Sequence, residues 1–302
     1  MKVRKLKSII AVVTVTSLAW SGAALASIVG GSLINLQADN NAGHPGLWSN
    51  NGSAGGSFQP DANGAPGLGQ DPNGTAYYDH TGGGSWGDTP GTTVSVHLES
   101  FTVESWLRPT AFPGGENQIY ALRAGGTRTS SGFRSFDGER KWIQFELNDA
   151  AGNRGFIRPT TGSALDISPP MSFSPTLNEW HHLTLTYQNA TSSEAGDGVA
   201  TVYANGVQLV QATGLPQYFS PSGADFNENT VGLQNYLESP GRAFEGHYNT
   251  FRVYDRVLSG AEVEQNFNED AVKFGLSVIP EPGTIALLGL GGLVLSLRRR
   301  RD

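Results

Sequence analysis

The fold class of this chain is decided by one stretch, Val199-Ala-Thr-Val-Tyr-Ala-Asn205-Gly206-Val-Gln-Leu-Val210. Both of its ends alternate between apolar and polar residues with a period of two, which predicts a pair of β-strands. Asn205 and Gly206 lie between them, and both tolerate the positive φ of a type I′ turn. The stretch therefore predicts a tight antiparallel hairpin.

Further short alternating runs lie on both sides of this hairpin, and turn residues separate them. Frequent short strands of this kind predict an all-β sandwich. Residues 40–88 are mostly Gly, Asn, Ser, Asp and Pro, which predicts long loops with one or two short strands. The predicted strands are 75–79, 93–98, 101–107, 119–123, 142–147, 155–158, 182–187, 199–203, 207–210 and 248–253.

One helix is predicted near the end of the sandwich. Ser259 and Glu262 form a capping box, and Val263 and Phe267 follow at i, i+4 spacing. We expect this short helix to cover an end of the sandwich.

The N-terminus carries the pattern of a secretory signal peptide. A basic start at residues 1–7 is followed by an apolar stretch at 8–18 and by Ala24-Leu-Ala26, which has the small residues of a cleavage site. We predict a signal peptide over residues 1–26. The body of the chain is then exported.

The C-terminus carries a short apolar span with a basic end. Pro280-Glu281-Pro282 precedes the apolar residues 284–297, and four arginines follow at 298–301. As a helix, 284–297 would cover about 21 Å, which is less than the roughly 30 Å of a bilayer's hydrocarbon core. The arginines favour the cytoplasmic side. We expect only a transient anchor in the inner membrane.

The order of these three C-terminal parts resembles the PEP-CTERM sorting signal of bacteria. The resemblance implies that an exosortase-type membrane enzyme recognises Pro280, Glu281 and Pro282, removes the tail and passes the protein to the cell surface or the extracellular matrix. An ordinary tail anchor is the alternative. The sorting signal is predicted to cover residues 276–302.

Composition narrows the function of the remaining body. Between residues 27 and 279 there are 12 basic and 25 acidic residues, so nucleic acid is excluded as a partner. The chain contains no cysteine, which excludes disulfides, thiolate metal sites and cysteine nucleophiles. The length of about 250 residues fits one β-sandwich domain.

Three segments, taken in order, resemble the LamG-like jelly-roll family of the concanavalin A-like lectin/glucanase superfamily. The resemblance implies one domain over residues 27–275, built as a two-sheet antiparallel jelly-roll sandwich with one short C-terminal helix and with binding loops at its rim. The segments are Phe101-Thr-Val-Glu-Ser-Trp-Leu-Arg-Pro109, Trp180-His-His-Leu-Thr-Leu-Thr-Tyr187 continuing to Tyr203-Ala-Asn-Gly206, and Phe244-Glu-Gly-His-Tyr-Asn-Thr-Phe-Arg-Val-Tyr-Asp-Arg-Val-Leu-Ser259.

Alternation along these segments predicts which side chains are structural. Phe101, Val103, Ser105 and Leu107 should face one side of their strand, and Thr102, Glu104 and Trp106 the other. Trp106 is read as a core residue. The rings of His181 and His182 should point to opposite faces, which suits no single metal ion. Arg252 and Tyr254 are placed in the last strand, where the resemblance implies a structural arginine.

No catalytic constellation is visible, so the chain is predicted not to be an enzyme. The Glu-x-Asp-x-x-Glu pattern of the related glucanases is missing, and Glu99 and Glu104 should face opposite sides of a strand. Gly83-Gly-Ser-Trp-Gly87 matches the nucleophile-elbow string but lies in a glycine-rich loop with no helix after it. We interpret that match as chance.

A structural calcium ion is one open possibility. Asp225 and Asn227 place oxygen atoms at alternate positions, but the EF-hand glycine and glutamate are missing. The family resemblance implies a calcium ion between an early strand and the last one, where this chain has Asn249 in place of an acid. The sequence leaves both outcomes open: one calcium held by Asp225, Asn227 and Asn249, or none.

Sugar recognition would use aromatic side chains in the rim loops. Trp86, Tyr218 and Tyr236 are the candidates, together with Trp48 and Phe219, although each could equally fill an end of the sandwich. The leading hypothesis is an exported, non-catalytic module that binds extracellular polysaccharide or a surface glycoprotein. The alternatives are a structural biofilm or surface-layer component, and a glycan hydrolase or lyase with unfamiliar residues.

Overall fold

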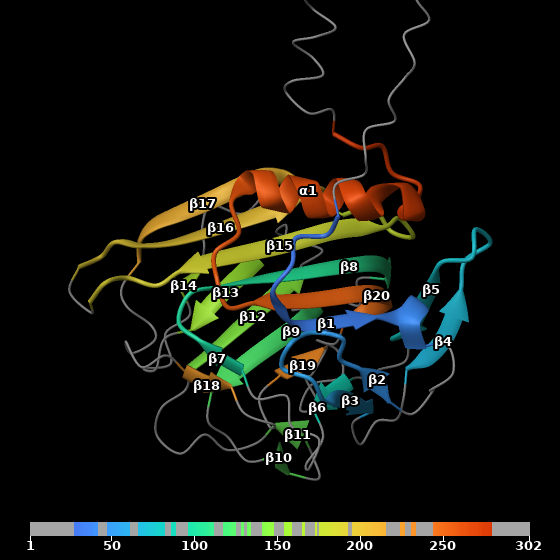
Figure 1. The fold of residues 1–302 in the computed structure, drawn as a ribbon, viewed down its shortest axis with the longest axis horizontal. Helices are drawn as coiled ribbons and strands as arrows, with labels where there is room; N and C mark the ends of the chain where they lie inside the picture. The colour runs from blue at the N-terminus through green and yellow to red at the C-terminus, as the bar shows by residue number, and fades with distance from the viewer. Residues whose placement is uncertain are drawn as a thin grey trace, which may run out of the picture.

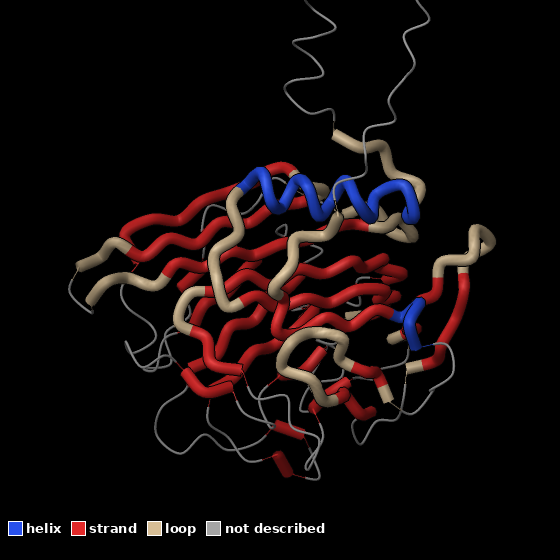
Figure 2. Tube along the Cα trace, viewed as in Figure 1, coloured by secondary structure: helices blue, strands red, loops and turns tan. Residues whose placement is uncertain are grey.

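The structure is a computed structural model. It describes residues 27–41, 47–60, 66–81, 86–88, 96–111, 117–124, 128–129, 132–133, 141–147, 154–158, 165–166, 173, 175–192, 195–215, 224–226, 231–233 and 244–279. Strands dominate this part of the chain, and a single α-helix of 12 residues accompanies them there (Figure 2).

Two sheets and two short ribbons make up the fold (Figure 1). Sheet A contains β1 (Ser32–Gln37), β4 (Gly67–Gln70), β5 (Ala76–Asp79), β8 (Phe101–Ala111), β15 (His181–Gln188), β16 (Gly198–Ala204), β17 (Val207–Leu215) and β20 (Glu245–Tyr254). Sheet B contains β2 (Trp48–Ser49), β3 (Ser57–Pro60), β6 (Trp86–Asp88), β9 (Asn117–Ala124), β12 (Lys141–Leu147), β13 (Arg154–Arg158), β14 (Leu165–Asp166) and β19 (Val231–Leu233). The ribbons pair β7 (Val96–Leu98) with β18 (Ala224–Phe226) and β10 (Arg128–Thr129) with β11 (Gly132–Phe133).

The strand order confirms the predicted antiparallel sandwich. Sheet A runs β17-β16-β15-β8-β20-β5-β4, and β1 also pairs with β20. The last strand, β20, is thus central: it has β8 on one edge and both β1 and β5 on the other. Sheet B runs β14-β13-β12-β9-β19-β6-β3-β2. Neighbours in space come from distant parts of the chain, as in a jelly roll.

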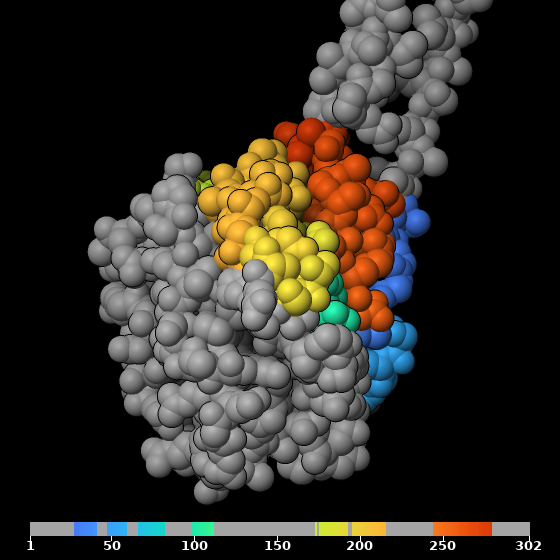
Figure 3. Space-filling view, turned by 90° about the vertical axis from the view of Figure 1, so that its left-hand side faces the viewer, coloured from blue at the N-terminus to red at the C-terminus, as the bar shows by residue number. Residues whose placement is uncertain are grey.

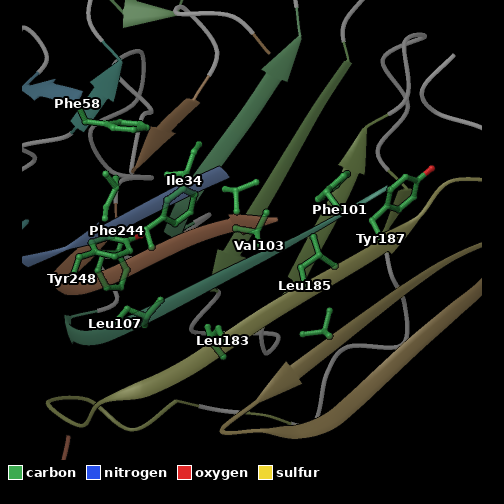
Figure 4. Packing of buried hydrophobic residues seen from close by; sticks show 14 of the residues in the cluster. Ile34, Phe58, Phe101, Val103, Leu107, Leu183, Leu185, Tyr187, Phe244 and Tyr248 are labelled. Carbon is green, nitrogen blue, oxygen red and sulfur yellow. The ribbon is translucent and has the colours of Figure 1, made fainter. Parts of the chain in front are cut away.

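The main core lies on the inner face of sheet A. Phe101, Val103 and Leu107 of β8 point into it together with Leu183 and Leu185 of β15 (Figure 4). For β8 the alternation assigned Phe101, Val103 and Leu107 to one face, so that prediction is confirmed.

Part of the outer face of sheet A is covered by the C-terminal helix α1 (Gly260–Ala271) (Figure 1) and by the short helix η3 (Val272–Phe274). Trp106 and Trp180 pack against Phe267 and Phe274 there. The predicted position at an end of the sandwich is therefore wrong. The aromatic side chains on the outer face of the sheet need an apolar cover, and the helix supplies it. In Figure 3 the surface of this C-terminal segment, orange to red, adjoins that of β16 and β17, coloured gold.

The local signals for the hairpin and the helix start are both confirmed. Asn205 and Gly206 join β16 to β17 with φ values of 49° and 77°. A Cβ on Gly206 would lie 3.0 Å from the Phe267 ring, so glycine also lets helix α1 approach closely. Ser259 caps α1, and Glu262 completes the capping box.

The glycine-rich part of the chain contains more strands than its composition predicts. The structure has β2 to β6 there, where one or two strands were expected, and the predicted strand at 75–79 is confirmed as β5. Asn50 holds one of the intervening loops: its Oδ1 accepts from Asn35 N, and its Nδ2 donates to Leu33 O and Gly55 O. β5 and β6 also pair with the distant strands β20 and β19, which local composition does not reveal.

Candidate binding surface

A cluster of polar and aromatic side chains lies on the outer face of sheet A, at the C-terminal end of β8. Arg108 of β8 is the register partner of His247 of β20, which is in turn the partner of Asp79 of β5. The turn before β5 and the residue before β15 each add one more side chain. We call this cluster the Arg108 patch, and its members are Asp71, Tyr77, Asp79, Arg108, Trp180 and His247.

Arg108 is held in one position by its neighbours. Its Nη2 lies 2.8 Å from Asp71 Oδ1, and its Nε donates to His247 Nδ1 at 3.0 Å. The guanidinium carbon is 5.0 Å from the ring centroid of Tyr77 and 5.1 Å from that of Trp180. Trp180 Nε1 donates in turn to Asp71 Oδ2 at 2.9 Å. Charge-assisted hydrogen bonds and cation–π contacts together fix the cation.

His247 is neutral at pH 7 in this arrangement. Burial, and next the charge of Arg108, lower the pKa of its imidazole below the usual value. Because Nδ1 accepts from Arg108, the ring proton lies on Nε2, which is 3.5 Å from Asp79 Oδ1. The ring also stacks on Tyr77, with the centroids 4.0 Å apart.

The patch is only partly covered. The side chain of Asp79 is 42 % exposed, whereas those of Arg108 and His247 are 17 % and 12 % exposed. Tyr77 is half-buried, and its ring lies over the backbone of Gly69, where a Cβ would come within 2.5 Å of the ring. A fixed aromatic ring beside an accessible carboxylate combines an apolar contact area with a polar group that can orient a ligand.

A second charged cluster lies beneath helix α1, where Glu104, Arg252 and Asn266 are buried. Glu104 accepts from Arg252 Nη1 through Oε1 and from Asn266 Nδ2, at 2.7 Å, through Oε2. Arg252 Nη2 is 2.9 Å from Asp270 Oδ2. Burial alone raises the pKa of Glu104, but Arg252, His182 and Asn266 outweigh it and hold that pKa at about 2. Glu104 is therefore a charged structural residue that is not exposed to a substrate.

The side chains that the sequence assigned to structural roles are found in those roles. Trp106 is buried between Phe274, with ring centroids 4.1 Å apart, and Phe267, at 5.8 Å. His182 packs against Trp106 on this outer face, whereas His181 contacts Phe173, which borders the main core. The two histidines thus point to opposite faces, as predicted.

Asn249, one of the three predicted calcium ligands, is buried and contacts the partly exposed Asp39 and the ammonium group of Lys273. Its Nδ2 donates to Asp39 Oδ2 at 3.0 Å, and its Oδ1 accepts from Lys273 Nζ at 3.0 Å. Lys273 also contacts Asp39 directly. Among the described residues, no group of three or more His, Cys, Asp and Glu side chains is placed to hold a metal ion.

Comparison with protein families agrees with the β-sandwich fold. Residues 81–264 match the family described as the concanavalin A-like lectin/glucanases superfamily. The chain belongs to this superfamily. A second match, to the PEP-CTERM protein-sorting motif, covers residues 278–301. Both resemblances seen in the sequence are confirmed.

The fold of this concanavalin A-like domain is similar to that of two toxin binding domains of known structure. The binding domain of Paraclostridial Mosquitocidal Protein 1 matches with a TM-score of 0.50 and 14% identity over 79% of this chain and 52% of that one. The binding domain of botulinum neurotoxin serotype D/C matches with a TM-score of 0.50 and 13% identity over the same shares. The chain therefore spans about half the length of these toxin domains, and the likeness shows the fold alone. No curated protein sequence matches it.

Several sequence predictions for the concanavalin A-like domain fall on residues whose side chains the structure does not describe. These are the ligand candidates Trp86, Tyr218, Phe219 and Tyr236 and the calcium candidates Asp225 and Asn227, with only the backbone described for Trp86 in β6 and Asp225 in β18. Trp48 is described, and it is a core residue whose ring centroid is 4.7 Å from that of Tyr78.

Most of the residues to which the membrane and sorting predictions apply are not described by the structure. Residues 1–26, the motif Pro280, Glu281 and Pro282, and the span at 284–297 lie outside the described residues. Within 27–279, no helix in the described part is long and apolar enough to cross a bilayer.

The Arg108 patch is the part of this concanavalin A-like domain that the sequence did not predict. Its members come from β5, β8, β20 and two connecting segments, so no local motif joins them. The sequence did indicate the orientation of Arg108: it lies two residues after Trp106 and four after Glu104 in β8, so it points to the same outer face. This alternation does not identify the residues that surround Arg108 on that face.

Proposed function

We propose that this protein is an exported, non-catalytic module that binds carbohydrate in the extracellular matrix or at the cell surface. The superfamily membership and the sorting motif support an exported binding module. The observation that carries the carbohydrate assignment is the Arg108 patch, in which a fixed Tyr77 ring lies beside the exposed carboxylate of Asp79.

The chemistry of the patch suits a sugar. The exposed part of the half-buried Tyr77 ring offers an apolar contact to the C–H groups of a pyranose, while Asp79 can accept hydrogen bonds from its hydroxyls. Because Arg108 and His247 already hold each other, a ligand would find the polar groups in place and would lose little free energy in ordering them.

Two of the described carboxylates, Glu104 and Asp71, do not suit catalysis. A glycosidase needs two carboxyl groups flanking the scissile bond, one of them able to donate a proton. Glu104 is buried beneath helix α1 with both oxygens occupied, and its pKa of about 2 leaves it without a proton at neutral pH. Asp71 is bound to Arg108 and Trp180.

Export and sorting follow from the two ends. We infer that a signal peptide at 1–26 directs export and that an exosortase-type enzyme processes the chain at Pro280–Pro282, after a transient stay of residues 284–297 in the inner membrane. The protein then reaches the cell surface or the matrix, where extracellular polysaccharide or a surface glycoprotein is its partner. One bound calcium ion remains part of the proposal.

A glycan array with matched variants tests the binding function. We expect the wild-type protein to be retained on at least one polysaccharide, and the Asp79→Asn and Tyr77→Ala variants to bind it roughly tenfold more weakly, because each loses one contact of the patch. Asp197→Asn is the matched control, since Asp197 is an exposed carboxylate bound to Thr191 in a different loop. Unchanged retention of both patch variants would exclude the Arg108 patch as the site.

The same array separates the alternatives. A structural biofilm or surface-layer component would be retained on no glycan. A hydrolase or lyase would release reducing or unsaturated ends from the retained glycan, and a single carboxylate substitution would abolish the release.

A further inference from the structure

The end of helix α1 and the short helix η3 are bound to sheet A by charged side chains. Arg252 contacts Asp270 at the end of α1, and Lys273 contacts Asp39 and Asn249 one turn later. These contacts hold helix α1 and Lys273 against the sandwich, six residues before Ile279.

The final described residue, Ile279, is held by helix α1 at both of its backbone polar groups. Asn268 Oδ1 accepts from the N–H of Ile279 at 2.6 Å, and Asn268 Nδ2 donates to its carbonyl oxygen at 3.0 Å. The side chain of Ile279 packs beside Phe267 and lies so close to the hairpin turn that a Cβ on Gly206 would be 2.9 Å from its Cδ1. Ile279 directly precedes Pro280, the first residue of the sorting motif.

The same helix holds the other end of the exported domain. Gln265 Nε2 donates to the carbonyl of Ser27 at 2.6 Å, and Asn266 Oδ1 accepts from the N–H of Val29 at 2.8 Å. Gln265 and Asn268 are three residues apart, which is about 4.5 Å along the helix axis. The first and last described residues therefore both lie beside α1 (Figure 1).

We propose that Asn268 is a latch that controls access of the processing enzyme to the sorting motif, an inference that rests on the sorting function proposed above. An enzyme that binds an extended chain uses the backbone N–H and C=O groups of residues next to the bond it acts on. At Ile279 both groups are occupied by Asn268. The latch must open before the segment around Pro280 can enter the enzyme, so Asn268 is a positioning residue for processing.

Amide hydrogen exchange of the full chain tests the latch itself. Removing two hydrogen bonds should make the Ile279 amide of Asn268→Ala exchange roughly 5- to 150-fold faster than that of the wild type. Asn268→Asp keeps the acceptor for this N–H and loses the donor, so its rate should fall between the two. Gln265→Ala, which releases only Ser27, should leave the Ile279 rate unchanged. Equal Ile279 rates in wild type and Asn268→Ala would overturn the latch.

Pulse-chase processing of the same variants in exosortase-bearing cells tests the control step. We expect tail removal, measured by intact mass, to be several-fold faster in Asn268→Ala, intermediate in Asn268→Asp and unchanged in Gln265→Ala. Faster exchange with unchanged or slower processing would overturn the gating role. If the wild-type tail is never removed, the proposed sorting function fails instead, while the exchange rates still decide whether the latch exists.

Discussion

Replacing Glu104 by glutamine tests whether the buried charges beneath α1 hold the helix on sheet A. The variant keeps the shape of the side chain and one oxygen, but its amide must face either Arg252 or the Nδ2 donor of Asn266. Asn266 cannot turn to compensate, because its Oδ1 already accepts from Val29 N–H. Removing one charged partner of a buried ion pair lowers the free energy of unfolding by about 3–5 kcal/mol. We expect a loss of that size in the free energy of unfolding at pH 7.

The pH dependence of unfolding gives a second, independent value for the stability that the Glu104 charge contributes. The pKa of Glu104 is lowered from 4.5 to about 2, because Arg252 and its other partners outweigh the effect of burial. A lowered carboxyl pKa contributes stability that is fully present above the unfolded pKa and is lost as the pH falls through the folded one. The contribution is about 3 kcal/mol at pH 7, and about 2 kcal/mol of it is lost by pH 3.

The assay is urea unfolding of wild type and Glu104→Gln at pH 7 and at pH 3. The wild type should lose about 2 kcal/mol more than the variant between the two pH values. Glu99→Gln, at an exposed position next to the start of β8, is the matched control and should behave as the wild type does at pH 7. Equal pH-dependent losses in wild type and Glu104→Gln would refute the assigned role of the buried carboxylate.

Three further predictions concern other parts of the molecule. Lys273→Met should lower the free energy of unfolding at pH 7 by about 2 kcal/mol, because Asp39 and Asn249 lose a charged donor. Lys273 also helps to keep the pKa of Asp39 low. In chemical unfolding, the variant should therefore lose less stability than the wild type as the pH falls below 4. Glycan binding should weaken as the pH falls through the lowered pKa of His247, because protonation of its ring removes the acceptor for Arg108, and retention on the array measured stepwise from pH 7 downward tests this. A chelator should lower the melting temperature by several degrees if the predicted calcium ion is bound, and an unchanged melting temperature would dismiss that ion.

Local chemistry in the sequence predicted the elements that depend on neighbours close in the chain. The turn at Asn205-Gly206 follows from the positive φ that both residues accept, and the start of α1 follows from the capping box at Ser259. The two faces of β8 follow from alternation, which placed Trp106 opposite Phe101. These predictions required no knowledge of the tertiary structure.

Features that join distant segments were not predictable in the same way. The position of α1 across sheet A depends on aromatic side chains from β8 and from the residue before β15, and its moderate amphipathicity does not show which surface it covers. The Arg108 patch brings together residues from β5, β8, β20 and two connecting segments. Each member alone resembles an ordinary strand or turn residue, and only the strand order assembles them.

The most direct test of carbohydrate binding by the Arg108 patch is amide hydrogen exchange with and without the glycan retained on the array. A bound glycan should slow exchange in β5 around Tyr77, in β8 around Arg108 and at the start of β20 around His247. Slowed exchange only in the predicted rim segments around Trp86, Tyr218 or Tyr236, with none at the Arg108 patch, would contradict this account.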